Sequence, residues 1–217
     1  MLRTTLIAVT PFQQNARILA ADGERGCVVV DPGGDVPLIL KELDRAGLEC
    51  REIWLTHSHL DHCGGVRALQ AATGARLLGH PAERPLREQV SAIAALYGIG
   101  GGGMEDCPEP DRYLSGGEVV ALGPLNFKVL FTPGHSPGHL CFYEPESHVL
   151  IAGDTVFAGS IGRTDLPGGE LATLLASIRA EILTLPPETI IMSGHGDDTT
   201  VGQELRTNPF LQGEAYG

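Results

Sequence analysis

Three apolar, strand-like segments of this chain end in histidine or aspartate, and this recurrence restricts the fold more than any other sequence feature. The polar ends lie at residues 55–59, 151–154 and 192–195, where the chain runs through Thr-His, Gly-Asp and Gly-His. If the strands lie side by side, these ends gather along one rim of a sheet, where layered α/β proteins build ligand sites. The sequence therefore predicts a layered fold with a site at one edge.

The opening of the chain predicts an antiparallel meander followed by a helix. The segments at 5–9, 16–21 and 26–31 carry strand-forming residues, and the third runs into a Pro-Gly-Gly turn. Between residues 36 and 46, apolar side chains recur at helical spacing, and Gly47 follows as a stop signal. We therefore expect an amphipathic helix over 36–46.

The remaining segments alternate between helix and strand, as in stacked layers. Helices are expected at 66–72, 84–98 and 169–183. Strands are expected at 52–56, 75–79, 118–122, 127–131, 140–144, 148–154 and 189–194. The segment 98–111, rich in glycine and proline, is expected to form a mobile loop or lid.

Composition excludes several classes of protein. A chain of 217 residues with 42% apolar content is expected to form a single domain, 1–217. The net charge of −12 disfavours nucleic acid and anionic membrane surfaces as partners. The five cysteines form no C-x-x-C pair, no segment is apolar enough to span a membrane, and the amino end lacks a secretory pattern. A cytoplasmic location fits best.

The stretch "THSHLDH" predicts a metal site. His57 and His59 lie two residues apart in an extended tail, so both imidazoles can reach one ion, while Asp61 and His62 can turn to a second point. Imidazole and carboxylate groups without thiolates suit a catalytic rather than a closed structural site. Further ligands are expected at the other strand ends, namely His135, Asp154 and His195.

The motifs "THSHLDH", "GHSPGH", "GDT" and "GHG", in this order, resemble the metallo-β-lactamase superfamily. The segments "VDPGGD", "FAGSIGRTDLPGG" and "LRTNPFL" resemble more narrowly its small, single-domain, glyoxalase II-like (hydroxyacylglutathione hydrolase-like) bacterial hydrolases. The resemblance implies an α/β (α+β) fold, a four-layer αβ/βα sandwich of two mixed β-sheets flanked by helices. It also implies a binuclear metal site at one edge.

Carried over onto this sequence, the family pattern implies a complete ligand set for two divalent metal ions. The first ion would be held by His57, His59 and His135, the second by Asp61, His62 and His195, and Asp154 would bridge both. Zinc is expected first, with iron or manganese as alternatives. A hydroxide bridging the metals would be the nucleophile, and Asp61 would also take a catalytic part by receiving a proton.

The implied reaction is hydrolysis of S-lactoylglutathione or a related acyl-glutathione thioester, with a small molecule as the only expected partner. The helical carboxyl-terminal domain with which larger glyoxalase II enzymes bind glutathione is not expected here, and the sequence predicts no oligomeric state. In the "GRTD" segment, Arg163 would hold a substrate carboxylate.

Alternatives stay open at this level, and one of them is a non-enzymatic metal-binding module or sensor. The same "GRTD" resembles persulfide dioxygenases, in which His57, His135 and Asp154 would bind a single iron that oxidises glutathione persulfide. Asp31 is either a turn-forming residue or an acceptor that orients a metal-bound histidine.

Overall fold

The computed structural model describes residues 1–99 and 103–212, which divide into two compact units. The first unit comprises residues 1–114 and 121–125, and the second comprises 115–120 and the described residues from 126 onward. Each unit is built around one six-stranded mixed sheet. The single domain 1–217 expected from the sequence stays a prediction.

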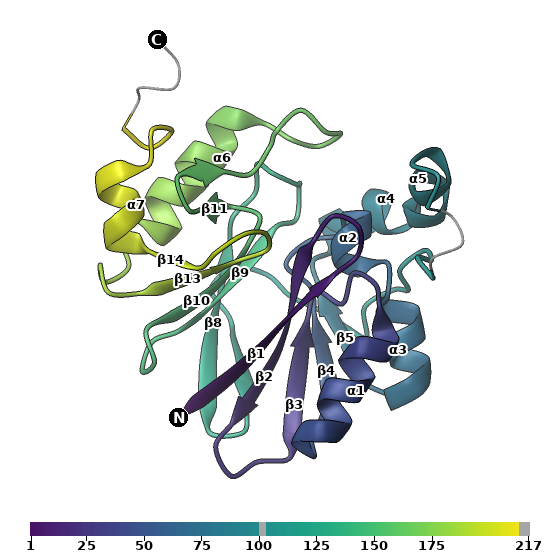
Figure 1. The fold of residues 1–217 in the computed structure, drawn as a ribbon. Coiled ribbons are helices and arrows are strands. Elements are labelled where there is room, and N and C mark those ends of the chain that lie inside the picture. The colour runs from purple at the N-terminus through teal and green to yellow at the C-terminus, as the bar shows by residue number, and fades with distance from the viewer. Residues whose placement is uncertain (100–102, 213–217) are drawn as a thin grey trace. The chain divides into compact units, whose positions relative to one another are not determined.

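The first sheet has the strand order β1-β2-β3-β4-β5-β6, and Figure 1 labels β1 to β5. Its strands are β1 (Leu2–Val9), β2 (Gln14–Ala21), β3 (Gly26–Val30), β4 (Glu49–Trp54), β5 (Arg76–Gly79) and β6 (Arg112–Tyr113). The first three strands pair antiparallel, which confirms the predicted meander, and the pairs from β3 to β6 are parallel. The carboxyl ends of β3, β4 and β5 therefore lie at the same edge of this sheet.

Helices α1 and α3 of the first unit pack against its sheet, and the shorter helices follow β4 and β5 or lie in their connections. The helices of this unit are α1 (Val36–Ala46), α2 (Leu60–Cys63), α3 (Val66–Thr73), the 3₁₀ helix η1 (Pro81–Glu83), α4 (Arg84–Arg87) and α5 (Val90–Leu96). Ile39 of α1 and Leu69 of α3 are fully buried in one apolar cluster with Ile53 and Leu77 of the sheet. Burying each such side chain stabilises the fold by about 1.5–3 kcal/mol.

The second sheet has the order β14-β13-β10-β9-β8-β7. Its strands are β7 (Val119–Leu122), β8 (Leu125–Phe131), β9 (Leu140–Glu144), β10 (Val149–Gly153), β13 (Ile190–Ser193) and β14 (Thr199–Thr200), and a small hairpin pairs β11 (Val156–Phe157) with β12 (Ser160–Ile161). Because β10 and β13 are parallel, Asp154 and His195, which follow these two strands, lie at the same end of the sheet.

The helices of the second unit follow the hairpin and the last strand. They are α6 (Leu171–Ser177), the π-helix η2 (Ile178–Ile182) and α7 (Val201–Thr207). The π turn is closed by a hydrogen bond from the amide of Leu183 to the carbonyl of Ile178. Ile178 and Ile182 are fully buried in a cluster with Leu150 and Ile191 of the sheet.

The structure confirms the expected fold class of two mixed β-sheets flanked by helices, and it changes some element boundaries. The helix over 36–46 has the predicted bounds and ends at Gly47, which adopts φ 64°. The helix expected at 84–98 is two short helices, because the backbone leaves helical geometry at Gln89 (φ −120°, ψ 6°). The helix expected at 169–183 continues as the π-helix.

The glycine-rich segment 98–111 has no helix or strand in its described part, as expected for a loop, and residues 100–102 lie outside the described residues. Within the part of the chain that the structure describes, no helix is long and apolar enough to cross a lipid bilayer.

Candidate metal centre

The predicted ligands of the first unit lie where two parallel strands end side by side. Val30 of β3 is in register with Trp54 of β4, and the amide of Asp31 donates to the carbonyl of Trp54 over 3.1 Å. This pairing places the residues that follow β3 next to those that follow β4. The spatial neighbours of the histidine cluster therefore include a segment more than twenty positions earlier in the chain.

Asp31 accepts hydrogen bonds from three donors at this edge. Its Oδ1 accepts from the amide of Thr56 (2.8 Å), and its Oδ2 accepts from the hydroxyl of Thr56 (2.6 Å) and from Nδ1 of His62 (3.0 Å). Its backbone adopts φ 50°, a left-handed conformation that aspartate tolerates better than most residues. Asp31 thus makes the turn and also accepts from a predicted ligand.

The hydrogen bonds of Asp31 settle which nitrogen each neighbouring histidine presents. An ionised carboxylate only accepts, so Nδ1 of His62 carries a proton and its Nε2 carries the lone pair. The hydroxyl of Thr56 donates its only proton to Asp31, so its oxygen accepts a hydrogen bond from Nδ1 of His57 (3.0 Å). Both histidines are fully buried, and both present Nε2 as a ligand atom.

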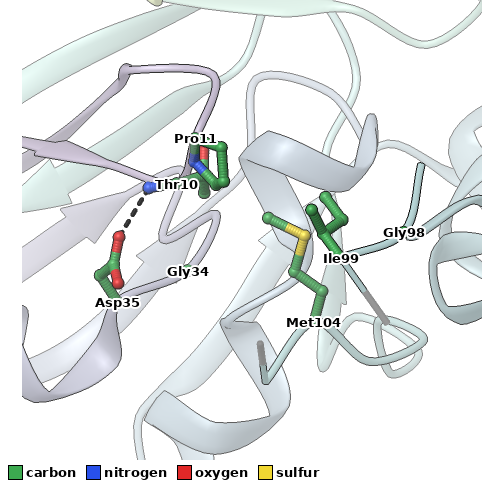
Figure 2. Close-up of a pocket in the computed structure, with 7 residues that line it drawn as sticks. All are labelled: Thr10, Pro11, Gly34, Asp35, Gly98, Ile99 and Met104. Carbon is green, nitrogen blue, oxygen red and sulfur yellow. Dashed lines mark hydrogen bonds between the residues drawn. The ribbon is translucent and has the colours of Figure 1, made fainter. Parts of the chain in front are cut away.

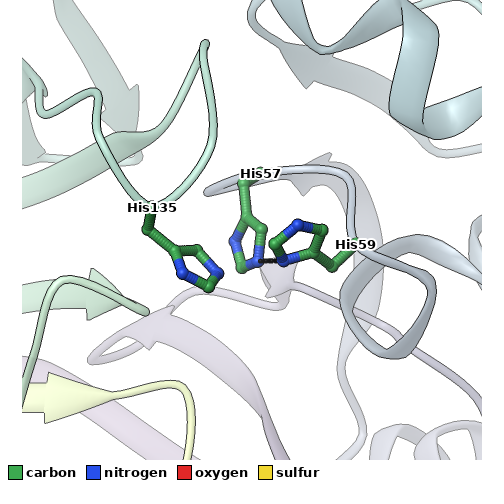
Figure 3. Close-up of side chains that lie close together, drawn as sticks. All are labelled: His57, His59 and His135. Atoms are coloured by element: carbon green, nitrogen blue, oxygen red, sulfur yellow. Dashed lines mark hydrogen bonds between the residues drawn. The ribbon is translucent and has the colours of Figure 1, made fainter. Parts of the chain in front are cut away.

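His57 and His59 form a close imidazole pair (Figure 3). Nε2 of His57 lies 3.1 Å from Nδ1 of His59, and the two rings are nearly perpendicular, at 88°. Two nitrogens bound to one tetrahedral ion at ordinary bond lengths would be about 3.3 Å apart. One proton satisfies the pair as it stands, and a divalent cation would replace that proton.

The second pair of predicted ligands in this unit is Asp61 with His62. Oδ2 of Asp61 lies 3.9 Å from Nε2 of His62, and both residues belong to the short helix α2. Gly33 packs so tightly beneath this helix that an added Cβ would lie 1.5 Å from the carbonyl oxygen of Asp61. The backbone of the turn after β3 therefore supports these two ligands directly.

A pocket of about 370 Å³ lies beside the same turn (Figure 2). It is lined by Thr10, Pro11, Gly34, Asp35, Gly98, Ile99 and Met104, and the carboxylate of Asp35 accepts from the amide of Thr10 (2.7 Å). None of the predicted ligands is among the described residues that line it. The pocket is thus distinct from the donor groups.

In the second unit, the carboxylate of Asp154 lies between two imidazoles. Its Oδ2 is 3.6 Å from Nε2 of His135 and 3.6 Å from Nε2 of His195. His135 follows β8, Asp154 follows β10 and His195 follows β13. A single oxygen placed equally between two ligand nitrogens has the arrangement expected of a bridging carboxylate.

Backbone groups orient the ligands of the second unit. Nδ1 of His135 donates to the carbonyl of Arg163 (2.7 Å), which leaves its Nε2 free of that proton and directed at Asp154. The amide of Asp154 donates to Nε2 of His139 (3.1 Å), a fully buried residue. An added Cβ at Gly162 would lie 1.9 Å from the carbonyl oxygen of Asp154.

The side chain of Arg163 is engaged by Asp165. Its guanidinium donates two hydrogen bonds of 2.7 Å to the two oxygens of that carboxylate, in an exposed bidentate pair. The hydrogen bond from Arg163 lowers the pKa of Asp165 to about 2. Contact of Arg163 with a substrate carboxylate stays a prediction, and it would require exchange of this partner.

Sequence reasoning missed two supporting groups. Glu83 is buried in the 3₁₀ helix, and its Oε2 accepts from the amide of Ser58, between the two histidines of the close pair. The carbonyl of Arg163 holds His135. Neither has a sequence signal, because Glu83 is one acid among many and a carbonyl is present at every position.

The donor set fits divalent metal ions. The ligand atoms are imidazole nitrogens and carboxylate oxygens. Within each unit, hydrogen bonding through Nδ1, from His62 to Asp31 and from His135 to the carbonyl of Arg163, leaves Nε2 of the same ring as a ligand atom. The cysteine next to His62, Cys63, is fully buried, and its Sγ contacts the carbonyl of Ser58. It contributes to packing.

Comparison with known proteins identifies the family. The family model of the metallo-β-lactamase superfamily matches residues 9–195. The chain belongs to the metallo-β-lactamase superfamily. This superfamily chain is 39% identical over 212 residues to hydroxyacylglutathione hydrolase GloC of Haemophilus influenzae, covering 97% of this chain and 98% of the relative.

Two solved structures share the superfamily fold closely. BLEG-1, a B3 metallo-β-lactamase, gives a TM-score of 0.88 at 40% identity, with 96% of this chain and 99% of that chain covered. TTHA1623 in a di-iron-bound form gives 0.87 at 40% identity, with 95% and 100% covered. The chain is therefore a metallohydrolase, and the fold together with the cluster of histidine and aspartate donors supports binding of divalent metal ions.

Proposed function

We propose that this enzyme hydrolyses S-lactoylglutathione or a related acyl-glutathione thioester, a small-molecule substrate, at a binuclear metal centre. The similarity to a hydroxyacylglutathione hydrolase along 97% of the chain supports the substrate class. The position of Asp154, 3.6 Å from each of two imidazoles, supports two ions rather than one. Zinc is proposed first, with iron or manganese as alternatives.

The proposed ligand roles follow the donor pairs of each unit. His57 and His59 would bind the first ion with His135, and Asp61 and His62 would bind the second with His195. Asp154 would bridge the two ions. When bound, such ions lower the pKa of coordinated water towards neutrality and polarise a carbonyl group.

The residues of the chain would then have distinct tasks. Asp31 accepts from Nδ1 of His62, so that Nε2 of this ring keeps its lone pair for a metal ion. As the C–S bond of the tetrahedral intermediate breaks to give the carboxylate and the thiolate, Asp61 would receive the proton of the added hydroxyl group. Because a thiolate is a good leaving group, the reaction needs no dedicated general acid.

We also propose that the enzyme works in a reducing cytosol. All five cysteines are free thiols, and all five are buried. Such a set is typical of proteins outside oxidising compartments.

The test is metal analysis of the purified enzyme together with hydrolysis of S-lactoylglutathione, in the unmodified chain and in Asp154→Asn. We expect Asp154→Asn to lose metal and hydrolysis together, because an amide bridges two cations poorly. Asp44→Asn, the same chemical change at an exposed position of α1, is the matched control and should alter neither. Full metal content and activity in Asp154→Asn would remove the bridging assignment.

The same preparation separates the alternatives. Oxygen uptake on glutathione persulfide, with a single iron per chain, would favour the dioxygenase. Turnover of a β-lactam faster than of any thioester would favour a lactamase, the activity named for BLEG-1.

A further inference from the structure

The strand β1 forms an unusually open edge of the first sheet. It is eight residues long, lies at the end of the strand order and pairs with β2 in one continuous register from Leu2 to Val9. Natural edge strands are commonly protected by proline, a bulge or short length. The segment "LRTTLIAV" has none of these, and its single charge is Arg3.

The register shows which backbone groups of β1 face outward. The carbonyl of Met1 accepts from the amide of Asp22, which marks Met1 and Asp22 as a hydrogen-bonded pair. Because such pairs alternate along an antiparallel ladder, the odd-numbered residues of β1 bond to β2. The amides and carbonyls of Leu2, Thr4, Leu6 and Ala8 therefore point away from β2.

A groove runs beside this edge, between β1 and the helix α1. It has a volume of about 380 Å³ and is lined by Thr5, Leu6, Ile7, Leu38, Lys41, Glu42 and Arg45. The four residues from α1 have the i, i+3, i+4, i+7 spacing of one helical stripe. Leu6 is 46% exposed and Leu38 is 48% exposed, so the open backbone is bordered by apolar surface.

We propose that β1 is the dimerisation strand of this protein and that it pairs antiparallel with β1 of a second copy. An antiparallel pair of identical strands has two-fold symmetry and places identical patches against each other. With the axis at Thr5, Leu2 faces Ala8 of the partner subunit and Thr4 faces Leu6 of the partner subunit. This register satisfies every outward backbone group of β1.

The charges beside the groove favour a second copy over a partner of one sign. The stripe on α1 carries the cations Lys41 and Arg45 and the anion Glu42, so it is self-complementary under a two-fold axis. Glu42 already pairs with Arg45 on the same helix (2.7 Å). A strongly acidic or basic peptide would meet like charge at one of these positions.

The test measures the mass of the full chain in solution, with Thr4→Pro as the disrupting variant and Thr4→Val as its matched control. Proline lacks only the outward amide of residue 4, which β2 does not use, and edge strands accept proline at such positions. Valine keeps the amide and the β-branched shape. Thermal unfolding of both variants, expected to match the unmodified chain, shows that the monomer fold is intact.

We expect the unmodified chain and Thr4→Val to sediment at twice the 22.9 kDa of one chain, and Thr4→Pro to sediment as a monomer. Amide hydrogen exchange should slow at Leu2, Thr4, Leu6 and Ala8 as concentration rises, and not at the odd-numbered residues between them. A monomeric unmodified chain overturns the proposal. So does a dimer that persists in a folded Thr4→Pro variant, or a dimer without this alternating protection.

Discussion

The two units orient their predicted ligands by different means. In the first unit, one side chain orients two histidines, since the carboxylate of Asp31 accepts from His62 directly and is linked to His57 through the hydroxyl of Thr56. In the second unit, the acceptor for His135 is a backbone carbonyl, that of Arg163. A histidine can therefore be oriented by a particular side chain in one unit and by a backbone carbonyl, which any residue would supply, in the other.

The largest expected effects on stability come from a feature that both units share, a glycine packed against the carbonyl oxygen of a predicted ligand. Gly33→Ala and Gly162→Ala would each push a Cβ into a carbonyl oxygen of a predicted ligand, at 1.5 Å and 1.9 Å. We expect a loss of about 3 kcal/mol or more in the free energy of unfolding for each, because backbone must shift. Denaturant unfolding measures this.

Gly26→Ala is the control for both glycine variants, because its Cβ would meet only a flexible arginine side chain at 3.4 Å. It should change the free energy of unfolding by less than about 1 kcal/mol. Unchanged unfolding in Gly33→Ala or Gly162→Ala would contradict the tight packing at that ligand.

The next largest effect, on metal affinity, is expected in the first unit only. Asp31→Ala leaves the amide and hydroxyl of Thr56 and Nδ1 of His62 without their acceptor. We expect metal affinity to fall about 10–100-fold, as for other groups that orient metal ligands. Metal titration of the purified variant checks this, with Asp31→Asn as a milder control that keeps one acceptor oxygen and tolerates the left-handed backbone.

The corresponding change in the second unit should leave metal binding alone. Arg163→Ala removes a guanidinium but keeps the carbonyl that accepts from His135. We expect unchanged metal affinity and, if Arg163 holds a substrate carboxylate, a raised KM with unchanged kcat. A fall in metal affinity matching that of Asp31→Ala would erase the distinction between the units.

The smallest effect concerns pH. Asp165 has its pKa lowered to about 2 by Arg163, so its contribution to stability is present above the ordinary carboxyl pKa near 3.8 and is lost as pH falls towards 2. The pair is exposed, which keeps this contribution small. In Arg163→Ala the pKa of Asp165 should rise towards 3.8, which NMR titration measures. An unchanged pKa would contradict the pairing.

The sequence predicted most reliably what local spacing encodes. The helix over 36–46 needed only periodicity and Gly47. The two-residue spacing of His57 and His59 was enough to expect the two imidazoles to lie together, as their 3.1 Å contact confirms, while the shared ion stays a prediction. For Asp31 the sequence left two interpretations open, and both describe its geometry, since it has φ 50° and accepts from His62.

What the sequence could not predict depends on neighbours brought together by folding. Glu83 supports the loop between two histidines from a helix that lies over twenty positions away. His139 accepts from the amide of Asp154, but its partner could not be named from spacing. The two-residue strands, such as β6 and β14, are too short to show any periodic pattern.

The carbonyl of Arg163 has a consequence for how this enzyme can change over evolutionary time. Because the contact to His135 uses a group that every amino acid possesses, natural variation can replace the side chain at residue 163 without disturbing the imidazole behind it. The side chain at residue 163 can therefore change while the hydrogen bond that orients His135 stays in place. Asp31 differs in this respect, because its contacts to Thr56 and His62 are made by the carboxylate, and a side chain without an acceptor oxygen at residue 31 would lose them.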